Sequence, residues 1–375
     1  MNPEAGGVVE AVHQSAMGIS NIEVLCFDDP NSTWLKKSRS YKVHALGTGK
    51  TTYSINFRYF SWLKKNAKSY DVVILDGIWQ FLVVGGFFLS LLKVPYCVFI
   101  HGMLDPYFNK DKLKYIKKLP FWFLVERPVI SMAAATIFTC QEEAQLARKS
   151  FPLFSANSIV SPLGIERAPN LTSVDVEHFY QRFPRLSNRR MVLFLSRVDE
   201  KKGVDLLVNA ISQQAEQLEN DVVFAFAGPC NKEYKQTLIE AINKAGVGEY
   251  VVWLGMLEGI SKWIAFKEAE VFILPSHQEN FGIVVAESLA SKTPVLITDK
   301  VNIWPTIVSY SAGIVGDDTN EGVTELLKLW FKAPQSRKEE MAEKAMLCFE
   351  EQFTQEHANK ILTDLLGKVV VKEGG

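Results

Sequence analysis

Two short segments in the second half of the chain carry the side chains best suited to chemistry. The first reads FLSRVDEKKG over residues 194–203: an apolar run ends, and a basic loop with Arg197 and Lys202 leads to Gly203. Because ligands of open parallel sheets bind at the carboxyl ends of the strands, both cations are predicted to project into a binding cleft. There they would stabilise a departing nucleoside diphosphate. A solvated cluster of surface charges is the other interpretation of this loop.

The second segment reads HQENFGIVVAE over residues 277–287. It predicts a loop around Gly282 and then a helix, whose first backbone N–H groups suit a phosphate or the polar edge of a sugar. Gly282 has no Cβ and permits a ligand to approach closely. Glu279 stands before the turn and Glu287 lies within the helix, so two carboxylates could face one ligand. Alternatively, they are a charge at the helix N-terminus and a charge on an exposed helix face.

Such segments need a scaffold of parallel strands, and the hydrophobic pattern predicts one. Short runs rich in Val, Ile and Phe alternate with longer helical patterns, which is typical of α/β domains whose parallel sheet is covered on both faces. In the first half, the expected strands are 23–27, 41–45, 72–75, 96–100 and 136–139. In the second half, they are 192–195, 222–227, 251–254, 271–274 and 295–298, with a helix over 204–218.

The chain is expected to form two domains, because 375 residues exceed what one ordinary core holds. The stretch 161–190 is polar and irregular, contains three prolines and predicts a linker. We expect an N-terminal domain over residues 1–165 and a C-terminal domain over 188–345. The terminal segment 346–375 is expected to contain a helix over 348–366 that packs back on the first domain.

Together the two segments resemble family four of the retaining glycosyltransferases, which have the GT-B fold: two Rossmann-like domains that face each other across a cleft. The resemblance covers nearly the whole chain. It rests on the S-R and K-G pairs around Arg197 and Lys202 and on the E-x7-E element from Glu279 to Glu287. It implies that Arg197 and Lys202 hold the donor diphosphate and that Glu279 contacts the donor sugar.

The resemblance also assigns the remaining donor contacts. Phe281, Gly282 and Ile283 are implied to lie beside the donor sugar, and Glu287 is implied to bind the ribose hydroxyls. Gly255, at the end of a predicted strand, would contact the base through its backbone.

The first half supplies fewer candidates. His101 follows a predicted strand, and by the resemblance it lies near the transferred sugar; a structural histidine with satisfied hydrogen bonds is the alternative. Asp105 is predicted either to orient the acceptor or to cap a turn. Gly6 and Gly7 resemble the family's first glycine loop, where backbone N–H groups approach the diphosphate or the acceptor.

A Rossmann-type domain normally opens with a buried strand that leads into this glycine loop. Here the loop follows Met1 directly and a helix is expected from about Val8, so the first strand is missing. We interpret this as a misassigned start site.

Composition restricts the partners. Lys and Arg number 41 against 42 Asp and Glu, for a net charge of -1, which argues against a general nucleic-acid binder. Five scattered cysteines suit a reducing compartment and show no zinc-ligand spacing. The apolar run 81–92 predicts a buried helix, because crossing a bilayer takes about 20 residues. The N-terminus lacks the pattern of a secretory signal, so a cytoplasmic protein is expected.

The segment from Lys110 to Phe123 interleaves lysines with aromatic residues. It predicts peripheral contact with an anionic membrane at its inner face, where a lipid-linked acceptor would be met. A solvated helix face followed by buried aromatics is the alternative interpretation.

The expected activity is transfer of a hexose from a nucleotide-diphosphate sugar to a hydroxyl of a glycan or lipid-linked acceptor, with retention, in bacterial polysaccharide or glycolipid assembly. No D-x-D sequence is present, and the two cations can take the role of a metal. We therefore expect no metal and no cofactor, the nucleotide sugar being a substrate. The alternatives are a GT-B nucleotide-sugar epimerase or phosphorylase, or a non-catalytic module that binds a sugar nucleotide.

Overall fold

Every strand pair in the three sheets formed by residues 7–373 is parallel, as the continuous apolar runs predict. The computed structural model describes residues 7–373. Central strands such as β8 (Val222–Ala227) and β4 (Tyr96–Phe99) are buried along their whole length. This burial requires helices on both faces of the two sheets that contain these strands, and the predicted α/β class is confirmed.

The described residues divide into two compact units. Unit 1 holds the chain up to Gly164 and again from Gln355, and unit 2 runs from Ile165 to Thr354. The helix expected over 348–366 is in fact two helices, because the chain leaves the helical conformation at Phe353 and Thr354. Helix α14 (Gln335–Gln352) therefore belongs to unit 2, and α15 (Gln355–Glu373) belongs to unit 1.

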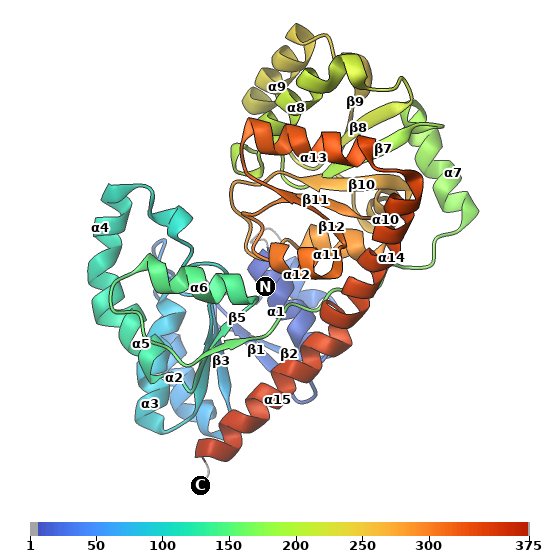
Figure 1. Cartoon of the computed structure of the whole chain (residues 1–375). Helices are drawn as coiled ribbons and strands as arrows, with labels where there is room; N and C mark the ends of the chain where they lie inside the picture. Colours follow the sequence, from blue (N-terminus) through green and yellow to red (C-terminus); the bar gives the residue numbers. More distant parts are fainter. Residues whose placement is uncertain (1–6, 374–375) are drawn as a thin grey trace. The chain divides into compact units, whose positions relative to one another are not determined.

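Unit 2 contains one six-stranded sheet with the strand order β12-β11-β10-β7-β8-β9. On one face α8 packs beside α13, and on the other α11 packs beside α10 and α14 (Figure 1). The strands are β7 (Arg190–Leu195), β8, β9 (Val251–Gly255), β10 (Ala269–Leu274), β11 (Val295–Thr298) and β12 (Gly313–Gly316). The helices are α7 (Ser173–Arg182), α8 (Val204–Gln214), α9 (Lys232–Lys244), α10 (Gly259–Glu268), α11 (Ile283–Ala290), α12 (Trp304–Tyr310), α13 (Asn320–Lys332) and α14.

Helix α7 lies inside the stretch that was predicted to be a linker, and that prediction is wrong there. Thr172 and Asp175 form a capping box in which each side chain accepts a hydrogen bond from the other residue's backbone N–H. The helix packs on α10, where the Tyr180 hydroxyl donates to Glu268 at 2.8 Å. The polar composition of the stretch reflects a surface helix.

Unit 1 has two sheets where one was expected. The larger has the order β3-β4-β5-β6, and β1 and β2 form a separate pair. Among residues 7–373, no strand pairs with both β1 and β3, and the chain enters the described part in helix α1. The strands are β1 (Glu23–Cys26), β2 (Lys42–Ala45), β3 (Val73–Asp76), β4, β5 (Ala135–Phe138) and β6 (Ser158–Val160). The helices are α1 (Gly7–Met17), α2 (Arg58–Asn66), α3 (Gly85–Leu92), α4 (Lys112–Phe121), α5 (Arg127–Met132), α6 (Gln141–Ser150) and α15.

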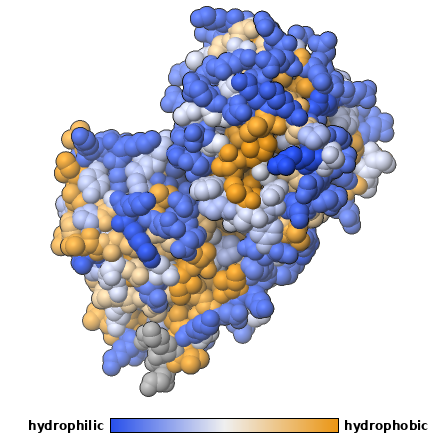
Figure 2. Space-filling view, in the orientation of Figure 1, coloured by the Kyte–Doolittle hydropathy of each residue, from blue (hydrophilic) through white to orange (hydrophobic). Residues whose placement is uncertain are grey.

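A π-helical turn, Trp122–Glu126, joins α4 to α5. Trp122 is buried in the core of unit 1, whereas Leu113, Ile116 and Leu124 point to solvent with 73%, 59% and 72% of their surface exposed. Figure 2 shows hydrophobic side chains along the outer edge of unit 1, over α4 and α5. Phe121 and Phe123 are exposed as well, so the aromatics of this segment are only partly buried.

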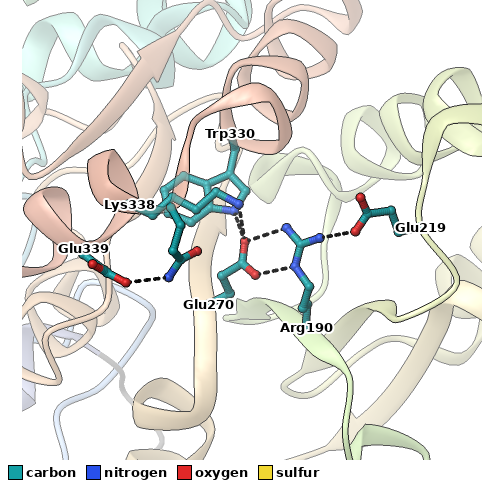
Figure 3. A network of polar contacts seen from close by, with 7 residues as sticks. Arg190, Glu219, Glu270, Trp330, Lys338 and Glu339 are labelled. Atoms are coloured by element: carbon teal, nitrogen blue, oxygen red, sulfur yellow. Dashed lines mark hydrogen bonds and ion pairs between the residues drawn. The ribbon is translucent and has the colours of Figure 1, made fainter.

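A polar network ties the amino ends of β7 and β10 to the helices of unit 2 (Figure 3). Glu270 of β10 accepts hydrogen bonds from Arg190 Nε at 2.6 Å, Lys338 Nζ at 2.8 Å and Trp330 Nε1 at 2.8 Å. Despite the burial that opposes ionisation, the Arg190 and Lys338 cations lower the pKa of Glu270 to about 2. The network lies at the edge of the sheet opposite to the predicted donor loops, so its role is structural.

Candidate functional site

The donor segments predicted from the sequence meet at one point of the unit 2 sheet. Strands β7 and β10 are neighbours, and the chain winds to β8 from one of them and to β11 from the other. Such a switch point leaves a crevice at the carboxyl ends of the strands, where open α/β sheets bind their ligands. The loop with Arg197 and Lys202 follows β7, and the loop with Glu279 follows β10.

Lys202 and Glu279 form an ion pair between Nζ and Oε2 across the two loops. The Lys202 side chain is 6% exposed and that of Glu279 is 21% exposed, so the pair is mostly shielded from water. A second tie lies beside it, because the backbone N–H of His277 donates to the carbonyl of Lys201 at 2.9 Å. The structure therefore brings the predicted cation and the first predicted carboxylate together.

Two glycines permit this close approach of the loops. Gly203 has φ 63°, and a Cβ at this position would collide with the carbonyl oxygen of Pro275 in the opposite loop. Gly282 has φ 73° and precedes α11, so Ile283 is the first helical residue. Both turns need a left-handed conformation, which glycine adopts without strain.

The Arg197 side chain is mostly exposed, unlike that of Lys202. Its side chain is 68% exposed, and its nearest ion-pair partner is Asp199, with 3.7 Å between Nη1 and Oδ2. The guanidinium thus lies outside the Lys202–Glu279 pair, although its charge acts on Lys201 of the same loop. Burial lowers the pKa of Lys201, the Glu279 charge opposes that shift, and the Lys202 and Arg197 charges lower it further.

Glu287 lies on α11, with its side chain 10% exposed, and Lys262 of α10 contacts its Oε1 at 2.6 Å. The Phe281 side chain is buried and packs edge-on against Phe353, with 5.5 Å between the ring centroids. Only the backbone of Phe281 can therefore serve a ligand. Gly255 ends β9, two strands away from β7, with φ 69°.

In unit 1, His101 lies at the carboxyl end of β4 with φ 51°. Its Nε2 lies 2.9 Å from Asp76 Oδ1, and its ring stacks on Phe99 at 4.0 Å. The next residue, Gly102, donates its N–H to Glu143 of α6 at 2.6 Å. These contacts hold the imidazole and its turn in one conformation.

The other candidates in unit 1 are Asp105 and the two glycines near the N-terminus. Asp105 accepts from the backbone N–H of Tyr107 at 2.8 Å and caps the short helix Pro106–Asn109, which is the capping role of the two predicted. Gly7 is the first residue of α1. Gly6 lies outside the described residues.

Three contacts were not predicted from the sequence: those made by Lys262, by Glu143, and by His277 with Asp318 at 3.0 Å. Each joins elements that are 25 or more residues apart. No local spacing identifies such residues, because only the fold brings them to the loops that they hold.

A groove of about 560 Å³ in unit 1 lies away from the candidate residues. It is bounded by the residues before β5 and β6 and by α15, at the amino ends of the strands. Since ligands of parallel sheets bind at the carboxyl ends, we do not assign it to the reaction. Within residues 7–373, no group of three His, Cys, Asp or Glu side chains is placed to hold a metal ion. Over the same residues, none of the helices has the length and apolar character needed to span a bilayer.

Glycosyltransferase family models match both halves of the chain. The model described as glycosyl transferases group 1 matches residues 176–346, and the glycosyl transferase 4-like domain matches residues 11–164. The phosphatidyl-myo-inositol mannosyltransferase of Mycobacterium leprae is 29% identical over 159 residues, which are 42% of this chain and 39% of that protein. The chain matches between 32% and 55% of the length of its first curated relatives.

Solved structures resemble the whole chain. HepE from Anabaena in complex with UDP superposes with a TM-score of 0.78 over 97% of this chain and 96% of that chain, at 15% identity. WaaG, a glycosyltransferase involved in lipopolysaccharide biosynthesis, gives 0.67 over 96% of both chains at 17% identity. At such identities the likeness concerns the fold. With family models matched on both halves and the fold shared along its length, the chain belongs to the GT-B glycosyltransferases of the family-four type.

Proposed function

We propose that the chain transfers a sugar from a nucleotide-diphosphate sugar to a hydroxyl of a glycan or lipid-linked acceptor, with retention of the anomeric configuration. The observation that carries the proposal is the shielded Lys202–Glu279 ion pair at the switch point between β7 and β10, beside the Gly282 turn that precedes α11. One cation and one carboxylate at this position match the two ends of a sugar diphosphate.

The chemistry follows from where charge develops. As the sugar–phosphate bond breaks, negative charge grows on the diphosphate and positive charge on the anomeric carbon. Lys202, with Arg197 nearby, would stabilise the diphosphate more in the transition state than in the ground state. Glu279 would bind sugar hydroxyls. Lys202 and Glu279 lie in contact, so one donor could place its diphosphate at Lys202 and its sugar at Glu279.

Retention requires the acceptor to attack from the face that the diphosphate leaves. The acceptor hydroxyl would form the new bond to the anomeric carbon and pass its proton to an oxygen of the departing diphosphate. No covalent intermediate on the protein is proposed. His101, whose ring is fixed by Asp76 and Phe99, is assigned to a hydroxyl of the transferred sugar.

The acceptor class is inferred from the similar proteins. The mycobacterial relative is named for a phosphatidyl-myo-inositol substrate, and WaaG is described as acting in lipopolysaccharide biosynthesis. Both support a role in glycolipid or polysaccharide assembly for this chain.

A panel of nucleotide sugars tests the proposal. With UDP- and GDP-linked hexoses at 100 times their dissociation constant, binding should add about 2.7 kcal/mol to the unfolding free energy, seen as a raised melting temperature. The stabilising compound should then release its nucleoside diphosphate slowly in water and faster with a glycan or glycolipid acceptor. No stabilisation by any member of the panel would overturn the donor site. Binding without any release, with or without acceptor, would favour a non-catalytic module.

We also propose that α4 docks unit 1 on an anionic membrane. Leu113 and Ile116 lie one helical turn apart on α4, Leu124 follows in the π-helical turn, and all three are exposed. Exposed lysines, among them Lys114 and Lys117, flank the first two. An apolar stripe with a basic border is typical of helices that lie in the membrane interface. The segment from Lys110 to Phe123 holds five lysines and one aspartate, so its charge complements anionic lipid.

Replacing Lys114 and Lys117 together by glutamate should weaken binding to vesicles that contain phosphatidylglycerol by more than about ten-fold, because each lysine contributes about 1 kcal/mol near an anionic surface. Flotation at low salt measures the bound fraction. The control replaces Lys232 and Lys244 of α9, which are also exposed, by glutamate and should bind like the original protein. If the unsubstituted protein does not float with these vesicles, α4 has no membrane role.

A further inference from the structure

An ion pair joins helix α10 to helix α11. Lys262 of α10 reaches across to Glu287 of α11, with 2.6 Å between Nζ and Oε1. The Lys262 side chain is 25% exposed and that of Glu287 is 10% exposed. Nζ also lies 5.1 Å from the centroid of the neighbouring Trp263 ring. The ammonium is thus held between a ring and a carboxylate.

This arrangement has a cost that the pair must offset. A carboxylate that is mostly removed from water is unfavourable unless a cation or hydrogen-bond donors compensate it. A charge-assisted hydrogen bond also fixes direction, since the carboxylate must keep one oxygen toward the ammonium. Lys262 therefore contributes to the direction in which Glu287 presents its carboxylate.

The position of the pair connects it to the nucleoside. Helix α10 begins at Gly259, four residues after the end of β9, and α11 begins at Ile283 after the Gly282 turn. Both helices thus start from loops at the carboxyl ends of strands, the edge at which the sheet binds its ligand. Glu287 is one helical turn into α11, counted from this edge.

We propose that Lys262 is a positioning residue for the nucleoside: it orients the Glu287 carboxylate toward the ribose hydroxyls and so makes the site prefer ribonucleotides to 2′-deoxyribonucleotides. The inference rests on the proposed function and on the ribose-binding role that the family resemblance implies for Glu287. The physical basis is that a group held in one direction hydrogen-bonds a particular hydroxyl well and discriminates against the analogue that lacks it.

Titration calorimetry of the full chain with UDP and 2′-deoxy-UDP, and with GDP and 2′-deoxy-GDP, tests this. Lys262→Met should weaken binding of the preferred ribonucleotide by about ten-fold, with little change for the deoxy form, because a hydrogen bond to a charged group is lost. The ratio of the two affinities should therefore fall toward one. Lys262→Arg should restore it. The matched control is Lys267→Met on an exposed position of the same helix, which should bind like the original protein.

Other outcomes separate this inference from the proposal on which it rests. If Glu287→Gln weakens ribonucleotide binding but Lys262→Met does not, Lys262 has no positioning role while the donor site stands. If Lys262→Met weakens the binding of ribonucleotides and deoxyribonucleotides equally, the substitution acts only by removing a positive charge from the site, and the inference is wrong. If Glu287→Gln changes neither, Glu287 does not bind the ribose and the inference is wrong, whereas failure of the original protein to bind any of the four nucleotides would refute the donor site itself. Should Lys262→Met fail to fold, Lys262→Gln is measured in its place, with the same expected fall in the ratio.

Discussion

Replacing Lys202 by alanine should reduce the rate of sugar transfer by about 10²–10³, the usual cost of removing one preorganised group that stabilises transition-state charge. The loop that carries Lys202 is fixed by the Gly203 turn and by the His277–Lys201 backbone bond, neither of which needs the side chain. The fold should therefore persist. Release of nucleoside diphosphate under saturating donor measures the rate, and circular dichroism checks the fold.

Arg197→Ala tests the same assignment from the other cation. Because Arg197 is exposed and holds Asp199 only at 3.7 Å, its loss should not disturb the loop. Lys244→Ala, at an exposed position of α9, is the control for loss of a surface charge and should leave the rate unchanged. Near-normal turnover in both Arg197→Ala and Lys202→Ala would refute the assignment of the donor diphosphate to this loop.

The second large effect concerns stability and involves a buried acid of unit 1. Glu126, in the π-helical turn after α4, is fully buried. Its Oε1 accepts from the Trp79 N–H at 3.0 Å, while its Oε2 has no hydrogen-bond partner among residues 7–373. Burial raises the pKa of Glu126 from 4.5 to about 8. The folded protein therefore retains a proton at neutral pH that the unfolded chain releases.

The sign of the pH dependence follows from that proton. Between pH 4.5 and pH 8, the folded state binds more protons than the unfolded state, so the free energy of unfolding falls as pH rises. Glu126→Gln removes this dependence. Relative to that variant, the free energy of unfolding of the original protein should fall by up to about 5 kcal/mol across the window. Urea unfolding of both proteins at several pH values measures the difference.

Glu10→Gln, at an exposed acid of α1, is the control and should follow the original protein at every pH. A constant difference between the original protein and Glu126→Gln would mean that Glu126 is ionised throughout. In that case a cation or water must compensate its second oxygen.

The strands could be predicted from the sequence because buried parallel strands are continuous apolar runs. All ten expected strands are present within one or two residues of their predicted ends. The two strands that were missed, β6 and β12, lack that signal. Strand β6 has only three residues, and β12 is the tetrapeptide GIVG, in which glycines flank a run of only two apolar residues. Helix α7 was missed because its polar surface resembles a loop, although Thr172 and Asp175 form a recognisable cap.

For the site, the sequence identified loops better than it identified contacts. Strand ends and glycines located the Lys202 and Glu279 loops, since those features depend on neighbours in the chain. It could not foresee that Lys202 and Glu279 would bond each other, that Arg197 would remain outside that pair, or that the Phe281 ring would turn into the core. Those outcomes depend on side chains that the fold brings together from distant segments.

The way the two units share one chain has a consequence for biosynthesis. Unit 2 is continuous, whereas unit 1 needs α15, whose Gln355 side chain bonds the backbone of Gln14 in α1. Domains generally fold as they emerge from the ribosome. Here all of unit 2 is translated before α15 is made, so α1 lacks its contact with α15 while unit 2 folds. During translation the surfaces of unit 1 that α15 later contacts, among them that of α1, stay open to a chaperone until α15 has been made.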